Sequence, residues 1–200
     1  MLFRSRAAQA AAVTAARAFV VAPGPSREFW LHLVFDDKRP GSPAYYGNQS
    51  LLGALERMHA VWLWVPLGIA LGCIGLWRAT RAHRAGTEIT AVALVGLTAL
   101  VVSPISWQHH AVWIVPAAAA LIAWATTPKR AGIGILAVAV FLFPLDFWGQ
   151  RLFSLGGSPW ITEVLRNAYA LAFIALLLLL PLPSPSRDSA PTGQRRMAWR

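Results

Sequence analysis

The apolar stretch AVWLWVPLGIALGCIGLW, residues 60–77, decides the fold class of this protein. It contains no charged side chain, and as an α-helix rising about 1.5 Å per residue it is just long enough to cross a bilayer core of about 30 Å. A helix pairs its backbone N–H and C=O groups internally, as a lipid environment requires. The stretch therefore predicts a transmembrane helix, the first secure span of the chain.

Further apolar blocks follow this span and are separated by short polar or basic segments. Their length and composition predict four more spans, at residues 89–105, 111–126, 131–148 and 168–182. Residues 60–182 are thus expected to form one transmembrane helical region. The predicted fold class is all-α, a polytopic transmembrane helical protein.

The composition argues against a water-soluble domain. Hydrophobic residues make up 56% of the sequence and charged residues only 13%, whereas soluble domains carry about 25% charged residues. The net charge of +10 could indicate a nucleic-acid partner. However, the Lys and Arg residues stand in short clusters between the apolar blocks, where the positive-inside rule places them. No nucleic-acid partner is therefore expected.

The segments that flank the membrane region are less regular. Residues 1–22 are predicted to form a weak apolar helix, which we interpret as the remnant of a preceding span in preference to a targeting segment. Residues 23–59 contain several Pro and Gly residues and are expected to form an outer loop with a short amphipathic helix at 26–35. Residues 183–200 are rich in Pro and Arg and are predicted to be a disordered cytoplasmic tail.

The positive-inside rule also orients the spans. The basic residues that follow the first, third and last spans are Arg78, Arg81, Arg84, Lys129, Arg130, Arg187, Arg195, Arg196 and Arg200. All of them fall on one side of the alternating spans, which the rule assigns to the cytoplasm. Residues 23–59, 103–110 and 149–166 are then expected to share the outer face. The tryptophans expected to form an aromatic belt there are Trp62, Trp64, Trp107, Trp113, Trp148 and Trp160.

A polar motif ends the second predicted span at the outer face. It reads Ser103-Pro104-Ile105-Ser106-Trp107-Gln108-His109-His110, and its candidate site residues are Ser103, Ser106, Trp107, His109 and His110. One interpretation is that the motif binds an anionic head group, because histidine can donate a hydrogen bond to a phosphate or transfer a proton near neutral pH. The alternative is a helix end whose histidines simply face water.

Two other kinds of site fit this motif less well. Adjacent helical residues point about 100° apart, and no carboxylate or cysteine stands at ligand spacing, so no metal site is expected. Ser106 has the spacing of a nucleophile with His109 or His110 as its base, but a hydrolase also needs an oxyanion hole and a group that orients the base. The motif calls for no cofactor.

A second polar cluster, Asn48-Gln49-Ser50, lies in the first outer loop beside Tyr45 and Tyr46. Neutral donors and acceptors next to aromatic rings suit sugar hydroxyls and the apolar faces of sugars, so these three residues are candidates for substrate binding. The alternative is that the cluster caps a helix. The match to the short glycosylation pattern is treated as coincidental.

These two motifs resemble a known family. Phe35-Asp36, Gly47-Asn48-Gln49-Ser50-Leu51 and the motif of residues 103–110 are similar to the actinobacterial polyprenol-phosphate-mannose-dependent alpha-(1,2)-mannosyltransferases, a branch of the C-type glycosyltransferases. The similarity runs from about Ser26 to the last span and corresponds to the carboxyl-terminal part of a family member. It implies a multi-pass protein of a bacterial plasma membrane with part of the C-type glycosyltransferase fold and its active site on the outer face.

The resemblance also implies a reaction. Mannose would move from a polyprenyl-phosphate-sugar donor to a hydroxyl of a glycolipid or lipoglycan acceptor, with His109 and His110 at the donor phosphate and Asn48 and Gln49 at sugar. The family places a catalytic aspartate in an earlier outer loop that this sequence does not contain, and Asp36 is not promoted to replace it. Residues 1–200 alone are therefore expected to be an inactive fragment of the enzyme.

Two rival functions stay open. A fragment of a transporter or permease would line a pathway with polar residues, but the predicted spans contain almost no ionisable residue apart from Asp146 near an outer end. A non-catalytic membrane scaffold would need no such pathway. An upstream sequence carrying an outer-loop aspartate would favour the enzyme over both rivals.

The predicted orientation can be tested by cysteine labelling. A cysteine introduced at Ser158 should react with an impermeant thiol reagent in intact cells, because residues 149–166 are expected outside, whereas one introduced at Gln194 should react only after lysis. Strong labelling of Gln194→Cys in intact cells, without labelling of Ser158→Cys, would reverse the topology.

Overall fold

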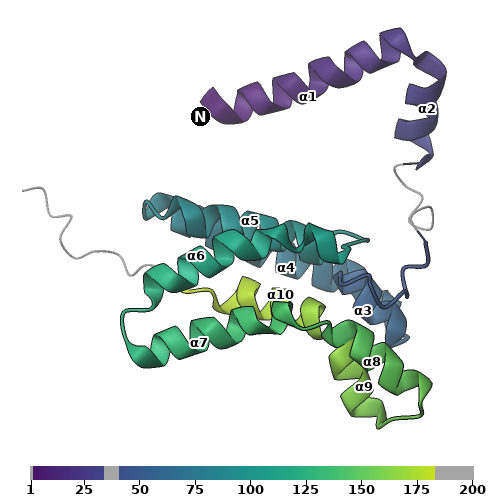
Figure 1. Cartoon of the computed structure of the whole chain (residues 1–200). Helices are drawn as coiled ribbons and strands as arrows, with labels where there is room; N and C mark the ends of the chain where they lie inside the picture. The colour runs from purple at the N-terminus through teal and green to yellow at the C-terminus, as the bar shows by residue number, and fades with distance from the viewer. Residues whose placement is uncertain (1, 34–40, 183–200) are drawn as a thin grey trace, which may run out of the picture. The chain divides into compact units, whose positions relative to one another are not determined.

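The computed structural model describes residues 2–33 and 41–182, with the side chains of the first range described from Gln9 onward. In these ranges all regular secondary structure is helical, which confirms the predicted fold class (Figure 1). The chain divides into two compact units, Met1–Pro43 and Ala44–Arg200. Asp36 and the predicted tail 183–200 lie outside the described residues.

The first unit contains the helices α1 (Leu2–Val21) and α2 (Pro23–Leu31). Residues 9–21 are apolar but shorter than a bilayer requires. The structure starts α2 at Pro23, earlier than the short helix predicted at 26–35. Proline is well tolerated in a first helical turn, because the N–H that it lacks would have no intrahelical partner there.

The second unit holds the remaining helices. In chain order these are α3 (Leu51–Arg57), η2 (Val61–Leu63), α4 (Trp64–Arg84), α5 (Glu88–Val102), η3 (Gln108–Trp113), α6 (Ile114–Trp124), α7 (Pro128–Ala139), η4 (Val140–Leu142), α8 (Leu145–Ser154), α9 (Pro159–Arg166) and α10 (Ala168–Leu179). The long helices α4, α5, α6, α7 and α10 run roughly along one another, and α3 and the α8–α9 hairpin lie at one end of them (Figure 1).

One continuous helix in the described residues, Val61–Arg84, is long and apolar enough to span a membrane. Two bent pairs qualify if each counts as one span: residues 128–142 with 145–154, bent by 56°, and residues 159–166 with 168–179, bent by 64°. The helix over predicted span 131–148 thus breaks at Phe143–Pro144 and turns into α8, because proline lacks an N–H and clashes with the preceding turn.

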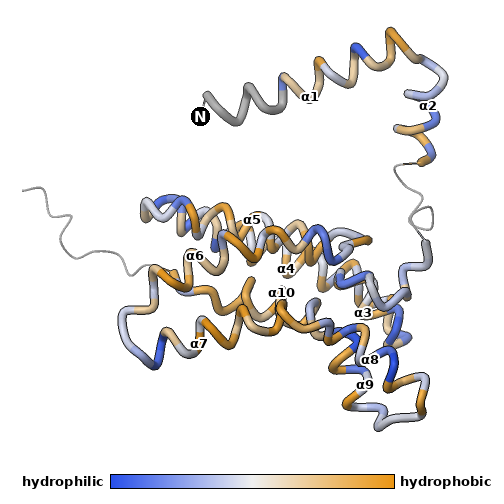
Figure 2. Tube along the Cα trace, in the orientation of Figure 1, coloured by the Kyte–Doolittle hydropathy of each residue, from blue (hydrophilic) through white to orange (hydrophobic). Residues whose placement is uncertain are grey.

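Apolar residues follow the long helices, and hydrophilic residues gather at their ends (Figure 2). The core lies around α5, whose Leu94, Leu97 and Val101 are fully buried, and it includes Phe173 and Leu177 of α10. Most large side chains of α4 instead face outward, as lipid-facing side chains do in a membrane span.

Two glycines let α5 approach its neighbours closely. A Cβ placed on Gly75 of α4 would lie 2.0 Å from Oγ1 of Thr98 and 2.9 Å from Leu177, and one placed on Gly96 of α5 would lie 2.1 Å from the Trp113 ring. Small residues at such contacts allow backbones to pack tightly in membranes, where dispersion and not the hydrophobic effect holds helices together. The contact between α4 and α5 therefore depends on Gly75.

This packing predicts opposite effects for two glycines of the same helix. Gly75→Ala should lower the unfolding free energy by about 1–3 kcal/mol, because the added methyl overlaps Thr98, whose hydroxyl is already bonded to the Leu94 carbonyl. Gly68→Ala has open space around it and should be neutral or stabilising by up to about 1 kcal/mol, the difference in helix propensity. Thermal unfolding in detergent measures both. A Gly75→Ala protein as stable as wild type would rule out this close contact.

Candidate active site at the broken end of α5

The chain leaves the helical conformation where α5 ends. Ser103 is the C-terminal cap residue, with φ −59° and ψ 140°, and its hydroxyl donates to the carbonyl of Ile105 at 2.8 Å. The backbone between Ser103 and the start of η3 has no helical hydrogen bonds of its own. Because buried backbone groups need partners, this segment depends on side chains from elsewhere.

Asn48 supplies those partners. Its Oδ1 accepts hydrogen bonds from the backbone N–H of Ser106 at 2.9 Å and of Ser50 at 3.2 Å, while its Nδ2 donates to the carbonyl of Pro104 at 3.1 Å. The N–H of Gln49 donates to the carbonyl of Ser106 at 2.8 Å. The Asn48–Ser50 segment and the broken end of α5 are thereby joined into one structure.

Ser50 acts as a helix cap. Its hydroxyl accepts from the N–H of Gly53 at 3.0 Å, which makes it the N-cap of α3, and donates to the Pro104 carbonyl at 2.9 Å. Serine is among the preferred residues at this position, because its oxygen satisfies an otherwise unpaired N–H of the first turn. The structure thus supports the helix-cap alternative for this cluster.

Gln49 connects the loop to the corner between α9 and α10. Its Nε2 donates to the carbonyls of Tyr46 at 2.6 Å and Arg166 at 2.8 Å, and its Oε1 accepts from the N–H of Ala170 at 3.0 Å. Its side chain is fully buried, as are those of Asn48 and Ser50. The direct contact of these residues with sugar stays a prediction, since their polar atoms are bonded to protein groups here.

Arg57, which the sequence does not single out, is the buried cation of this junction. It is 7% exposed, its Nε and Nη2 donate to Oδ1 of Asn167 at 2.9 and 2.6 Å, and its Nη1 donates to the carbonyls of Tyr45 and Asn48 at 2.9 Å each. Burial, and secondarily the charge of Arg166, lowers the pKa of Arg57 to about 10. The guanidinium therefore remains charged at neutral pH, held by neutral oxygens.

Ser106 is buried beside the same loop. Its hydroxyl donates to the carbonyl of Leu100 at 2.7 Å. The proton that a general base would remove is thus engaged by the end of α5. This geometry gives Ser106 a structural role and does not favour its use as a nucleophile.

The two histidines lie apart from this buried cluster, on the exposed helix η3. Their rings meet edge to face with centroids 4.3 Å apart. Nδ1 of His110 accepts a hydrogen bond from the N–H of Trp107 at 3.3 Å, which fixes the neutral tautomer with its proton on Nε2. Partial desolvation and His109 lower the pKa of His110, so the ring is neutral at pH 7 and offers a donor at Nε2.

Trp107, which precedes the histidine pair in the chain, belongs to a small aromatic cluster with Tyr45 and Tyr46. The ring of Trp107 packs at a tilt against Tyr45, with centroids 5.6 Å apart, and Tyr45 packs against Tyr46 at 4.6 Å. Tyr45 is exposed, and Trp107 is half-buried. An exposed aromatic surface next to hydrogen-bond donors is suited to a sugar ring.

Asp146, like Arg57, is a buried residue at the η3 end of the bundle whose role the sequence does not reveal. Its side chain is fully buried at the start of α8, and Oδ2 accepts a hydrogen bond from Nε2 of Gln108 in η3. Its Oδ1 has no hydrogen-bond partner among the described residues. In the sequence the only indication was an acidic residue two positions after Pro144 in an apolar block. The fold shows that this residue, Asp146, holds η3 through Gln108.

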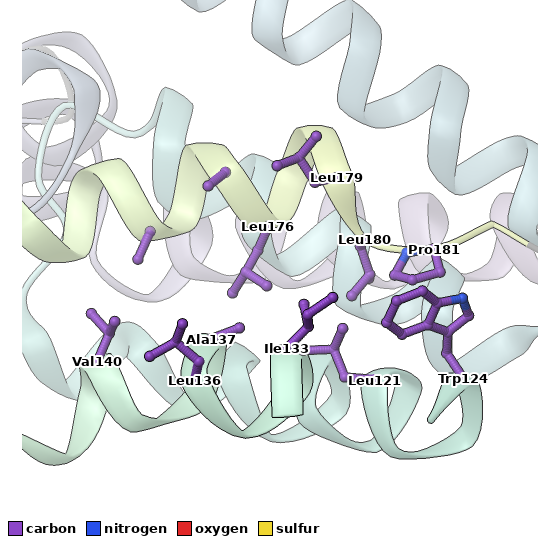
Figure 3. Close-up of a pocket in the computed structure, with 12 residues that line it drawn as sticks. Leu121, Trp124, Ile133, Leu136, Ala137, Val140, Leu176, Leu179, Leu180 and Pro181 are labelled. Atoms are coloured by element: carbon purple, nitrogen blue, oxygen red, sulfur yellow. The ribbon is translucent and has the colours of Figure 1, made fainter. Parts of the chain in front are cut away.

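No group of three or more His, Cys, Asp or Glu side chains in the described part of the chain is close enough to hold a metal ion. An apolar cavity of about 370 Å³ lies elsewhere, among α6, α7 and α10 (Figure 3). Its lining residues are Leu121, Trp124, Ile133, Leu136, Ala137, Val140, Ala172, Ala175, Leu176, Leu179, Leu180 and Pro181. Such a lining suits hydrocarbon, and its one polar side-chain group is the indole N–H of Trp124.

The buried amide of Gln49 makes a testable contribution to stability. Gln49→Ala leaves two carbonyls and one N–H without partners and should cost at least about 3 kcal/mol, at about 1–3 kcal/mol for each buried group left unpaired. Gln150→Ala, on the half-buried surface of α8, should change the unfolding free energy by less than about 0.5 kcal/mol. Chemical denaturation in mixed micelles compares the two, and equal stability would show that the Gln49 bonds are not made.

Comparison with known proteins places this sequence in a family. Residues 1–104 match the profile of glycosyltransferase family 87. A polyprenol-phosphate-mannose-dependent alpha-(1-2)-phosphatidylinositol mannoside mannosyltransferase of Mycobacterium tuberculosis is 38% identical over 111 residues, covering 53% of this chain and 26% of the relative. A polyprenol-phosphate-mannose-dependent alpha-(1-2)-phosphatidylinositol pentamannoside mannosyltransferase of Mycolicibacterium smegmatis is 28% identical over 172 residues, covering 80% of this chain and 41% of the relative.

The chain therefore spans less than half the length of these curated relatives. No solved structure matches it. The family profile nevertheless covers more than half of the 200 residues and includes the Asn48–Ser50 cluster, in agreement with the resemblance that the motifs show. The chain belongs to glycosyltransferase family 87.

Proposed function

We propose that this chain forms part of a multi-pass mannosyltransferase of a bacterial plasma membrane. The enzyme would transfer mannose from a polyprenyl-phosphate-mannose donor to a hydroxyl of a glycolipid or lipoglycan acceptor on the outer face. The observation that carries the proposal is His110, whose ring is held by the Trp107 N–H and presents a donor at Nε2. Membership of glycosyltransferase family 87 and relatives that bear this activity in their names support it.

In this reaction the acceptor oxygen attacks the anomeric carbon of mannose, the bond from that carbon to the phosphate oxygen breaks, and a base takes the acceptor proton. The phosphate departs with increased negative charge. A fixed donor aimed at that charge lowers the barrier, and no metal is required where protein donors suffice. His110 would stabilise the leaving phosphate through Nε2, with His109 beside it.

The buried polar residues take a supporting role in this proposal. Asn48, Gln49, Ser50, Ser103 and Ser106 bond to backbone groups and so hold η3 and the outer loop in place. Contact with the mannosyl ring would fall to the aromatic surface of Tyr45 and Trp107. The hydrocarbon tail of a lipid substrate would remain among apolar helices.

The arrangement of charges favours a transferase over a transporter. In the described residues the buried ionisable groups Arg57 and Asp146 sit together at the end of the bundle that carries the histidines. No Asp, Glu, Lys, Arg or His occurs in α6 or α10, where a polar pathway through the bundle would need one. A polar end above an apolar bundle suits a reaction at the membrane surface.

Donor binding tests the role of His110. In the full chain reconstituted in vesicles, His110→Ala should weaken binding of polyprenyl-phosphate-mannose about 10- to 100-fold, because a hydrogen bond to a charged group contributes about 1.5–3 kcal/mol. His109→Ala should weaken it less, since no described backbone bond fixes its ring. A titration with labelled donor gives the dissociation constants.

The matched control is His59→Asn, which alters an exposed histidine of the loop after α3 and keeps a residue that tolerates its φ of 56°. Its donor affinity should equal that of wild type. Unchanged binding in His110→Ala, or an equal loss in His59→Asn, would contradict a specific phosphate contact and leave the motif as a structural helix end.

A further inference from the structure

The α8–α9 hairpin is a compact pair of short helices. A Cβ on Gly149 of α8 would lie 2.4 Å from the N atom of Arg166 and 2.7 Å from the carbonyl carbon of Leu165, so the two helices touch through backbone. Gly156 turns the chain between them with φ 72°, a conformation that glycine adopts readily. Thr162 is buried in the pair and donates to the Ser158 carbonyl at 3.0 Å. The two helices of the hairpin are thus closely packed against each other.

The hairpin leaves the bundle at an angle on both sides. The bend is 56° where the chain enters α8 and 64° where it leaves α9. Residues 128–142 before the first bend form a helical stretch roughly 22 Å long, shorter than a bilayer core of about 30 Å. The hairpin therefore does not continue either neighbouring helix as a straight span.

The exposed surface of the hairpin is apolar on one side. On α8 the apolar stripe consists of Trp148, Leu152 and Leu155, which recur at helical spacing, and on α9 it consists of Trp160, Ile161 and Val164. Trp160 is 84% exposed, Leu155 68% and Trp148 55%. The polar side chains Arg151 and Ser154 occupy another exposed face of α8, which they share with Phe147. The exposed side chains of α9 are all apolar, and its polar Thr162, Glu163 and Arg166 are buried or half-buried.

We propose that the α8–α9 hairpin lies in the plane of the outer lipid–water interface, with its apolar stripe immersed in the lipid. Tryptophan is enriched at this boundary, because its ring is apolar and its N–H reaches water, and short helices with one apolar face bind there. Exposed Trp62 and Trp113, beside the starts of α4 and α6, place the same boundary on neighbouring helices. Exposed Arg151 suits the lipid phosphates.

The hairpin is hydrogen-bonded to the elements that position the histidines. Asp146 of α8 accepts a hydrogen bond from Gln108 of η3, and the Arg166 carbonyl of α9 accepts one from Gln49. The hairpin is therefore bonded both to the helix that carries His110 and to the loop behind it. By lying at the interface it holds His110 at the depth of lipid phosphates. The interfacial position itself does not rest on transferase activity.

Nitroxide labelling in vesicles tests the placement. In a Cys73→Ser background, Trp148→Cys, Trp160→Cys and Val164→Cys report on the stripe, and Ser154→Cys and Ser158→Cys report on polar positions. Stripe labels should be relaxed strongly by oxygen and weakly by a water-soluble nickel chelate, and the polar labels should show the reverse. Labels at 148 and 160 should lie at equal depth, within about 5 Å, one helical turn.

Three results would overturn the proposal. Nickel access at the stripe equal to that at Ser154 would place the stripe in water, and a depth that increases steadily along α8 would make the hairpin part of a span. Protection of the stripe labels from both reagents would mean that protein covers the stripe. Trp160 is so exposed that its replacement removes little packing. The comparison of labels at 160 and 158 therefore decides the matter even if Trp148→Cys folds poorly.

Discussion

The hydrogen bonds that Asn48 makes to the broken end of α5 are the interaction on which this structure depends. A break in a membrane helix frees backbone N–H and C=O groups where little water is present to satisfy them. One carboxamide pairs with the N–H of Ser106 and the carbonyl of Pro104, and Ser50 and Gln49 complete the set. Without these bonds neither the turn toward η3 nor the start of α3 would have a defined position.

The same end of the bundle holds two buried ionisable side chains. Arg57 is surrounded by carbonyl and amide oxygens, and Asp146 is bonded to one neutral amide. Removing charges from water is costly unless hydrogen bonds replace the hydration shell, so such groups persist where they position something. Here they tie α3, η3, α8 and the α9–α10 corner together around the exposed histidines. A polar end on an apolar bundle is the part of the described structure that could hold a polar ligand.

The division between apolar bundle and polar end also explains the exposed surface. In water, so many outward leucines, valines and tryptophans would be unfavourable, but lipid removes that cost along the spans. At the hairpin the apolar stripe and polar residues share one short helix pair, the pattern of a segment at the boundary between both environments. Its hydrogen bond from Gln108 connects the hairpin directly to η3.

The sequence alone determined the helical class, the order of the apolar segments, the two polar motifs and their family, because hydropathy and short-range spacing are local properties. The break at Pro144 and the inclination of α8 were not evident, since an apolar run of that length is equally consistent with a straight span. Tertiary structure alone decided which motif residues face inward. Asn48 and Ser106 are far apart in the chain, and only folding shows that the amide is occupied by backbone, while no described residue accepts a hydrogen bond from Nε2 of His110. Asp146 and Arg57 became site residues in the same way, through partners that no local pattern identifies.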